Sequence, residues 1–506
     1  MSVSKQPGSE TPLVKHHSGR ASISEVRSRI CALFSIDFRS LAMVRFAIAG
    51  IVLVDLLARS RFIEALYSDA GVLPVRLLTS HDRSLSLHAM HGSVTLQLVL
   101  FVLGMIAALM MLIGYRTRFS TFITWTLTVS LHNRNTYLLD GADTLLASML
   151  LWGIFLPLGA CWSIDAQNSR TRQSTQPTII SPATVALLLQ FVFFYVSAGL
   201  AKTGDEWLVT GTAVEIALSQ DYWVRALGEY LRQYPQLLRV LTPMVVYFER
   251  FAPLLLFVPF FTARVRMIVI VSFWLFMLGL GTTLQLNLMP WVSSVAILPF
   301  LPTQVWDFFS TKLKREKSEG VSSPAPWDAA VSSSTSTSKA FGPEQWLVLL
   351  LMIFVLVTMP LPLGAKRTSK LQDVSSRLGL NLVWSMYSPP PSYDYVHDVV
   401  ATLQDGSKIE LDNTADEDQW AQINRIHRTY RFKCYMESSV FDRVRAKRYL
   451  IWLTRQWEAH RPKHQHPDNV KLVTSAKRIM SRDPPQLYLM SELTGRDLEA
   501  IRREWR

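Results

Sequence analysis

Long runs of apolar residues constrain this chain more than any other feature. A bilayer core of about 30 Å needs roughly 20 apolar residues per helix, and fewer where neighbouring helices bury the ends. Nine stretches meet this requirement, the third and eighth of them marginally; they cover residues 41–58, 93–114, 119–131, 143–159, 182–201, 243–262, 267–283, 287–301 and 345–363. The sequence therefore predicts an all-α polytopic membrane protein of about nine transmembrane helices, with a smaller C-terminal α+β extramembrane domain.

The composition agrees with this class. Of the 506 residues, 49% are hydrophobic and only 18% are charged, which is little charge for a soluble protein. The net charge of +13 does not indicate a nucleic acid, because Lys and Arg flank apolar runs or are scattered over the last 140 residues. We therefore expect membrane lipid as a partner and no nucleic acid. The three cysteines are far apart and predict neither a disulfide framework nor a metal site.

Basic residues in the short loops predict the orientation, because Lys and Arg are retained on the cytoplasmic side of a membrane. With the N-terminus inside, nine spans also place inside the pairs Arg116 and Arg118, Arg170 and Arg172, Arg264 and Arg266, and the basic cluster 312–317. The opposite loops carry fewer excess positive charges. The N-terminus is therefore predicted to be cytoplasmic and the C-terminal domain extracytoplasmic, and no cleaved signal peptide is evident.

Changes in composition divide the chain into five parts. These are a cytoplasmic tail (1–34), a helical membrane domain of eight spans (35–302), a disordered cytoplasmic loop (303–343), a ninth transmembrane helix (344–364) and an extracytoplasmic α+β domain (365–506). The loop is assigned from its Ser-, Thr- and Pro-rich stretches, which are too polar to bury a core. In the last domain, alternating runs on either side of Asp405-Gly406 predict a β-hairpin.

Lys202, which ends the fifth span, is the first candidate site residue. An ionisable group at membrane depth is costly and is a functional candidate by default. Desolvation in an apolar pocket can make a lysine serve as an amine base. The alternative is a structural lysine whose ammonium group reaches the membrane interface. Position alone favours the structural alternative.

A second group of polar residues closes the third span. His132, Asn133, Asn135 and Tyr137 bring donors, acceptors and one imidazole into a short turn that suits a polar ligand head, and Asp140 leads into the next span as a structural or ion-pairing residue. The alternative is an interhelical turn whose side chains satisfy one another. His132 has no second ligand at helical spacing, so no metal is expected.

Glu249 and Arg250 lie inside the sixth span. Neighbours in sequence point to different faces of a helix, so each needs a partner on another helix. A structural ion pair explains Glu249 at least as well as catalysis does. The sequence contains no Gly-Lys-Ser/Thr phosphate loop, no His-Glu-x-x-His and no Gly-x-Ser-x-Gly. Nor does it show the inverted repeats or broken helices of a transporter.

Six motifs occur in order over about residues 35–410. They are Tyr-Ser-Asp-Ala-Gly-Val-Leu-Pro at 67–74, Leu-His-Asn-Arg-Asn-Thr-Tyr-Leu-Leu-Asp-Gly at 131–141, Trp-Ser-Ile-Asp at 162–165, Ala-Gly-Leu-Ala-Lys-(x)4-Trp at 198–207, Met-Pro-Trp at 289–291 and Trp-Ser-Met-Tyr-Ser-Pro at 384–389. In this set the chain resembles the vitamin K-dependent γ-glutamyl carboxylases and their bacterial relatives, the horizontally transferred transmembrane (HTTM) domain proteins. Each motif is weak alone, and the ordered set is specific.

The resemblance implies a membrane enzyme of the lyase class that couples oxygenation of reduced vitamin K, a menaquinol-type isoprenoid quinol, to carboxylation of glutamyl residues in an exported peptide. O2 and CO2 would be co-substrates, and no metal is implied. The family's catalytic lysine, which deprotonates the quinol, matches Lys202, and the tryptophan of the same motif matches Trp207. His132, Asn133, Asn135 and Tyr137 would position the quinone or the substrate.

Two positions depart from the animal enzymes. Their histidine before Ser-Tyr-Leu is replaced by Asn135 here, and a second histidine, upstream of Phe-Pro, falls near Met277. An imidazole can shuttle protons, whereas an asparagine can only donate or accept hydrogen bonds. An alternative therefore stays open: a non-catalytic membrane maturation factor, or a quinone- or lipid-binding scaffold, for an exported peptide.

Overall fold

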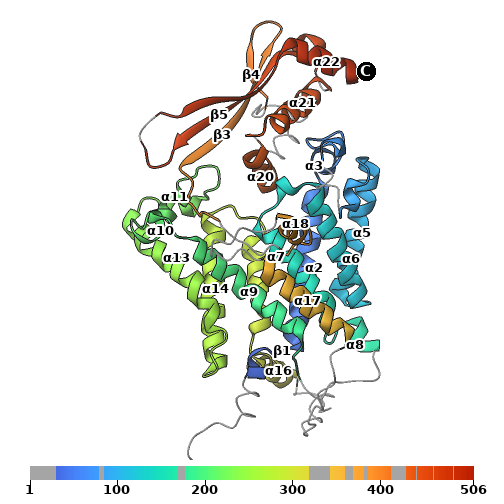
Figure 1. Ribbon diagram of the computed structural model, residues 1–506, viewed down its shortest axis with the longest axis vertical. Coiled ribbons are helices and arrows are strands. Elements are labelled where there is room, and N and C mark those ends of the chain that lie inside the picture. The colour runs from blue at the N-terminus through green and yellow to red at the C-terminus, as the bar shows by residue number, and fades with distance from the viewer. Residues whose placement is uncertain are drawn as a thin grey trace, which may run out of the picture.

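A helical bundle and a small sheet domain make up the part of the chain that the computed structural model describes. Figure 1 shows the sheet above one end of the bundle. The described residues are 30–78, 85–168, 177–317, 342–358, 369–380, 386–411, 429–439, 441–459, 461–481 and 484–505. Most of the predicted N-terminal tail (1–34) and of the predicted loop 303–343 lies outside them.

Helices form most of the described chain. The bundle helices are α2 (Phe38–Ser60), α3 (Ile63–Tyr67), α5 (Val94–Ile113), α6 (Thr117–Arg134), α7 (Gly141–Phe155), α8 (Ile164–Asn168), α9 (Pro182–Ala201), α10 (Asp205–Leu208), α11 (Ala213–Leu218), α12 (Ala226–Leu231), α13 (Pro235–Leu255), α14 (Thr262–Thr283), α15 (Met289–Ala296), α16 (Thr303–Lys317), α17 (Pro343–Thr358) and α18 (Ser369–Arg377). Short 3-10 turns are η1 (Val75–Leu77), η2 (Leu87–Ala89), η3 (Thr136–Leu138) and η4 (Leu298–Phe300), and β1 (Ile36–Asp37) pairs with β2 (Thr178–Ile179).

Each of the nine predicted spans overlaps a helix. By length and composition, four described helices can cross a membrane: α2, α5, α9 and α14. Three more, in α7, α15 with η4, and α17, are apolar but shorter. The structure therefore supports a helical membrane protein, while the number nine and the orientation stay predictions. The eighth predicted span is interrupted after Ala296, where Pro299 lacks the N–H that would continue an α-helix.

Side chains that cap the backbone determine where several helices begin. Ser181 and Thr184 form a reciprocal capping box at the start of α9, with Pro182 in the first turn. Asp140 accepts from the backbone nitrogens of Ala142 and Asp143 at the start of α7. The sixth span was predicted at 243–262, but α13 begins earlier, at Pro235, and ends at Leu255. A proline costs little in the first turn, where its missing N–H would have no intrahelical partner.

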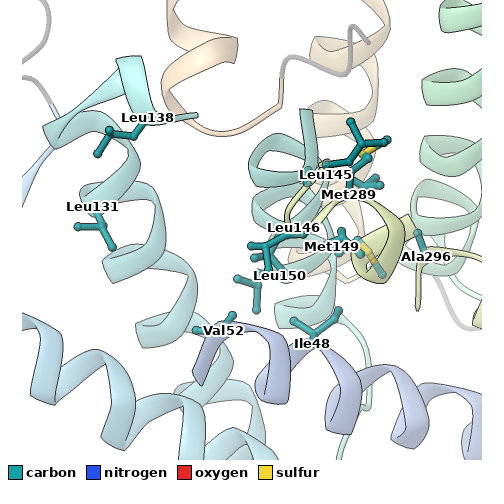
Figure 2. Close-up of a cluster of buried hydrophobic side chains, with 14 of the residues drawn as sticks. Ile48, Val52, Leu131, Leu138, Leu145, Leu146, Met149, Leu150, Met289 and Ala296 are labelled. Atoms are coloured by element: carbon teal, nitrogen blue, oxygen red, sulfur yellow. The ribbon is translucent and has the colours of Figure 1, made fainter. Parts of the chain in front are cut away.

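Helix α7 lies at the centre of the bundle. Its residues from Ala142 to Gly153 are buried except for Thr144. Figure 2 shows Leu146 and Leu150 of α7 facing Val52 of α2, with Met289 of α15 on the other side. Helix α14, by contrast, has only 28% of its apolar stretch buried, as expected of a helix that faces lipid. This arrangement leaves α7 and α9 as the inner helices of the bundle.

The C-terminal region is an α+β domain. A four-stranded antiparallel sheet has the order β4 (Lys408–Glu410), β3 (Tyr393–Leu403), β5 (Pro467–Arg478), β6 (Gln486–Leu493), accompanied by α20 (Tyr430–Ser439), α21 (Arg443–Ala459), η5 (Lys463–Gln465) and α22 (Gly495–Trp505). The hairpin predicted around Asp405-Gly406 is present, with Ala401 opposite Ile409 and a φ of 83° at Gly406 that favours glycine.

Two boundaries differ from the predicted domains. The segment 303–343 was predicted as a disordered loop, but its first 15 residues form α16, so that prediction is wrong there. The Ser- and Thr-rich composition that suggested a loop begins only after this helix. Helix α18 was assigned to the C-terminal domain. Gly379, which follows it, packs against Ala147 of α7 in the bundle, where an added Cβ would lie 2.4 Å from the Cβ of Ala147.

Candidate functional site

The last turn of α9 lies very close to α13. A Cβ on Gly199 would be 2.9 Å from the backbone nitrogen of Arg250, so a larger residue does not fit without displacement. Arg250 then holds the helix end, because its Nε donates to the carbonyl oxygen of Gly199 at 2.7 Å and its Nη2 to that of Lys202 at 2.9 Å. Carbonyl groups at a helix C-terminus lack intrahelical partners. The glycine and the arginine together fix the backbone from which Lys202 extends.

Lys202 and Glu249 form a buried ion pair across this contact. Nζ of Lys202 lies 2.6 Å from Oε2 of Glu249, and the two residues are only 3% and 4% exposed. A second acceptor, the carbonyl oxygen of Ala198, lies 3.4 Å from Nζ. The partner that Glu249 required on another helix is therefore Lys202. The ammonium group of Lys202 points to this carboxylate and not to water.

Trp207 contacts Lys202 and is itself bonded to Tyr387. Nζ of Lys202 lies 5.2 Å from the centroid of the Trp207 ring, within the range of a cation–π contact. Trp207 is buried, and its Nε1 donates to the backbone oxygen of Tyr387 at 2.9 Å. Tyr387 has a φ of 56°, a left-handed conformation that is uncommon outside glycine. The motif at 384–389 thus contacts the motif at 198–207 through the backbone carbonyl of Tyr387, a residue with an unusual backbone conformation.

A second buried cluster, which we call the junction network, connects the bundle to the C-terminal domain. Its members are Asp55 and Arg59 of α2, His132 of α6, Asp143 of α7 and Arg431 of α20. Arg59 donates to Asp55 at 2.7 Å and to Asp143 at 2.8 Å. Arg431 donates to both carboxylate oxygens of Asp143 and, at 3.2 Å, to Asp55. Two carboxylates thus balance two guanidinium groups, as burial of charge requires.

The C-terminal domain supplies Arg431 to this network. Burial by itself lowers the pKa of the Arg431 guanidinium, but the carboxylates of Asp143, Asp55 and Asp140 outweigh burial, so its pKa lies well above the ordinary value. Nη1 also donates to the carbonyl oxygen of Leu138 at 3.0 Å. Arg431 is therefore a permanent cation that holds α20 against the bundle.

The polar turn after α6 is largely occupied by structural bonds. Nδ2 of Asn133 donates to the backbone oxygen of Arg377 at 3.0 Å, and Nε2 of His132 lies 3.4 Å from Asp143. The guanidinium of Arg445 lies over the Tyr137 ring, with its Cζ 4.0 Å from the ring centroid. Among the described residues, none of these side chains bonds to Lys202. They form the contact between bundle and C-terminal domain.

Asn135 differs from its neighbours in this turn. Its Nδ2 donates to the backbone oxygen of Leu66 at 2.9 Å, which fixes the amide. Its Oδ1 is buried and has no hydrogen-bond partner among the described residues. A buried acceptor without a partner costs about 1–3 kcal/mol, so this atom can accept a bond from a ligand. Met277, the second departure, accepts a weak bond from the Tyr195 hydroxyl at 3.8 Å.

The structure thus separates the candidate residues into two places. Lys202, Trp207 and Glu249 come together, and the residues of the polar turn lie around the junction network. The sequence reasoning did not find Asp55, Arg59 and Arg431. Asp55 and Arg59 were detectable as an ion pair at i, i+4 spacing within the first span. Arg431 had no local signal, because it is one of many arginines in the C-terminal region.

The arrangement around Lys202 suits proton transfer. Among the described residues, no group of three or more His, Cys, Asp and Glu side chains could hold a metal ion. The amine of Lys202 and the carboxylate of Glu249, 2.6 Å apart, are within hydrogen-bond reach, the distance at which a proton can pass between two groups.

Comparison with known proteins gives one match. A family model described as the HTTM domain matches residues 34–306, more than half of the chain. The matched range includes α2 to α15, Lys202, Glu249 and the polar turn after α6. No curated protein and no solved structure matches the chain. Together with the apolar helices, the match indicates a membrane protein.

Proposed function

We propose that this chain, which belongs to the HTTM domain family, is a membrane-embedded enzyme of the γ-carboxylase type. Membership of that family is consistent with a relationship to the vitamin K-dependent carboxylases. The enzyme would couple the oxygenation of reduced vitamin K to carboxylation of glutamyl residues in an exported peptide. The observation that carries this proposal is the buried pair of Lys202 and Glu249, with Nζ and Oε2 at 2.6 Å.

Lys202 acts as the base in this proposal, and Glu249 makes that possible. A lysine can accept a proton only after it has lost one, and Oε2 of Glu249 is positioned to receive it. Both side chains are nearly inaccessible to water. Arg250 fixes the backbone of Lys202 from the other side and is a positioning residue.

The residues around Lys202 fit a quinol. The amine is flanked by the ring of Trp207, and Trp207 packs with Ala213 and Val246, so the surroundings are aromatic and apolar. When bound, reduced vitamin K supplies on reaction with O2 the strong base that removes the γ-proton of a glutamyl residue, to which CO2 then adds. This chain contributes the buried amine, its carboxylate and the exclusion of water.

A second candidate function is a quinone-binding maturation factor without turnover. Asn135 favours it, because its amide cannot move a proton where the animal enzymes have an imidazole. Its Oδ1 has no partner and can still accept a bond from a ligand hydroxyl. Binding of a quinol without formation of an epoxide is the expected behaviour of such a protein.

Turnover by purified full-length protein tests the proposal. Protein in lipid nanodiscs would receive reduced vitamin K, O2, labelled bicarbonate and a glutamyl peptide, with epoxide measured by chromatography and label counted in the peptide. Lys202→Ala should lower both products at least 100-fold, since a positioned general base contributes about 10²–10⁴-fold. Glu249→Gln should lower them by a smaller factor.

Lys471→Ala is the matched control, because Lys471 pairs with Glu492 on the sheet, away from the bundle. It should leave turnover unchanged. Quinol binding without epoxide in the well-folded wild-type protein would establish the maturation factor instead. Epoxide without labelled peptide would keep Lys202 as the base and reject carboxylation.

A further inference from the structure

Helix α16 leaves the bundle at the end opposite the sheet (Figure 1). Two residues near its start are bonded to α2. Nε1 of Trp306 donates to Oγ of Ser40 at 2.8 Å, and Nη1 of Arg39 donates to the carboxylate of Asp307 at 2.9 Å. Arg39 and Ser40 lie in the first turn of α2, which is long and apolar enough to cross a membrane. Helix α16 therefore starts at the level where α2 begins.

This level corresponds to the membrane interface. The headgroup layer is roughly 5–7 Å deep on each side of the hydrocarbon core, about half the diameter of a helix, so a helix bonded to the first turn of a span lies against lipid headgroups. Trp162, just before α8, is 50% exposed, and its ring packs edge-on against Trp306 with the centroids 5.8 Å apart. Tryptophan is enriched at this depth, because its ring is apolar and its N–H is polar. Both tryptophans therefore support an interfacial position.

The face of α16 that points away from α2 begins with exposed aromatic rings. Phe308 is 64% exposed and Phe309 is 53% exposed, and their rings pack together with the centroids 5.8 Å apart. Successive residues of an α-helix are about 100° apart, so Phe308 lies about 200° from Trp306 and faces away from α2. Large apolar rings gain free energy when they leave water. At an interface, the boundary between headgroups and acyl chains takes up such rings.

Basic residues follow these rings on the same helix. The segment 312–317 reads Lys-Leu-Lys-Arg-Glu-Lys, with four basic residues and one acidic residue. Positions 312 and 315 are four and seven residues after Phe308, a spacing that puts all three positions on one helix face. Arg116 is exposed at the same end of the bundle, where its backbone N–H donates to Asp165 of α8 at 2.9 Å. An apolar ring followed by cations matches an anionic lipid, which has apolar chains and a charged phosphate.

We propose that α16 is an interfacial helix that binds anionic phospholipid headgroups, with Phe308 at the acyl boundary and the cations of positions 312 and 315 at the lipid phosphates. In a zwitterionic lipid the phosphate charge is balanced within the headgroup, so such a lipid gains less from these cations. Each basic residue near an anionic surface increases binding about fivefold, which corresponds to roughly 1 kcal/mol. A soluble protein partner is the weaker choice, because α16 starts at the level of the bilayer. The site is independent of the reaction proposed for Lys202.

Photocrosslinking from position 308 tests the proposal. In full-length protein, p-benzoylphenylalanine replaces Phe308, and the protein is placed in nanodiscs that contain phosphatidylglycerol and phosphatidylcholine in equal amounts. After irradiation, mass spectrometry identifies each lipid adduct by its headgroup. Phosphatidylglycerol adducts should outnumber phosphatidylcholine adducts at least about fivefold. The ratio should fall toward one in about 0.5 M salt, where screening shortens the reach of the charges.

Two double variants that remove the same charge locate the contact. Lys312→Gln with Arg315→Gln removes the cations on the face of Phe308 and should bring the ratio to about one. Lys314→Gln with Lys317→Gln removes two cations from positions about 120° and 180° away and should keep most of the preference. The comparison separates binding by one face from a diffuse effect of net charge.

Leu275 of α14 is the matched control site, because it is 62% exposed on a helix that can cross the membrane. p-Benzoylphenylalanine there should give lipid adducts without preference for a headgroup. A ratio of about one at position 308 as well would overturn the proposal. So would an equal loss of preference in the two double variants, or the absence of lipid adducts at position 308. Adducts to protein alone would show that this face binds another segment of the chain or a second copy, which also overturns it.

Discussion

The two buried ionic clusters of this protein differ in how completely their members are bonded. In the junction network, Asp143 accepts from two arginines and also lies 3.4 Å from His132. The pair at the end of α9 has one short contact, between Lys202 and Glu249, and one long contact to a carbonyl oxygen. A lysine ammonium has three hydrogens to donate, and among the described residues Lys202 has two acceptors. All three guanidinium nitrogens of Arg59, by contrast, have an acceptor.

This difference distinguishes a structural cluster from a candidate reactive one. Arginine stays charged and binds carboxylates in fixed fork geometry, so the two arginines of the network can hold two domains together but do not serve as bases. Lysine loses its charge readily when it is buried, which is why it serves as a base. Burial alone does not separate the two roles, since both clusters are buried to a similar extent.

The largest expected effect comes from breaking the network at Arg431. Arg431→Met leaves Asp143 and Asp55 with one guanidinium between them, so we expect a loss of about 4–5 kcal/mol in the free energy of unfolding. Denaturation in mixed micelles would measure it. Limited proteolysis should cut more rapidly near α20. Arg443→Met, on the exposed face of α21, is the control and should change the free energy by less than about 0.5 kcal/mol. Equal effects of both variants would remove the network's structural role.

The next effect separates stability from activity at the pair. Lys202→Met alone leaves Glu249 buried without its cation, and we expect a loss of about 3 kcal/mol. The double variant Lys202→Met with Glu249→Met should recover most of this loss while turnover stays absent, because two apolar groups of similar volume replace the pair. Recovery of turnover in the double variant would show that Lys202 is not the base.

A smaller effect is expected where α9 meets α13. Gly199→Ala places a methyl group 2.9 Å from the backbone nitrogen of Arg250, so overpacking should cost about 2 kcal/mol and lower turnover by displacing Lys202. Gly279→Ala is the control, because a Cβ there has no other atom within 4 Å. It should be neutral or stabilise α14, since alanine favours helices over glycine. The melting temperatures of the two variants, compared with that of the wild-type protein, test this expectation.

The smallest expected effect concerns the bond from Trp207 to the C-terminal region. Trp207→Phe keeps an aromatic ring beside Lys202 but removes the indole N–H that donates to Tyr387. We expect a loss of about 1 kcal/mol in stability. If the contact also excludes water from Lys202, turnover should fall further than this loss of stability explains. Unchanged turnover would limit the contact to a structural role.

The local parts of the fold could be predicted from the sequence. The fifth span, predicted at 182–201, coincides with α9, and the hairpin predicted around Asp405-Gly406 is present. These signals depend only on neighbours in the chain. The extent of α13 was mispredicted, because apolar content marks the core of a span whereas the helix itself extends to Pro235 through polar residues.

Contacts between distant segments could not be predicted in this way. Lys202 and Glu249 were each notable as ionisable groups in apolar runs, but their pairing joins two helices 47 positions apart. The bond from Trp207 to Tyr387 spans 180 positions, and its acceptor is a backbone atom that any residue could supply. Side-chain chemistry therefore suggested which residues matter, and only packing decides which of them meet.

The junction network can be completed only late in synthesis of the chain. Arg431 lies 288 positions after Asp143 in the chain. At a synthesis rate of about 5–20 residues per second, Asp143 waits roughly 15–60 seconds for its second arginine. Throughout that interval the cluster contains two aspartates and one arginine, and a prematurely ended chain keeps this imbalance permanently. Arg431 also follows every helix of the bundle in the chain, so the network is completed only after the whole bundle has been synthesised.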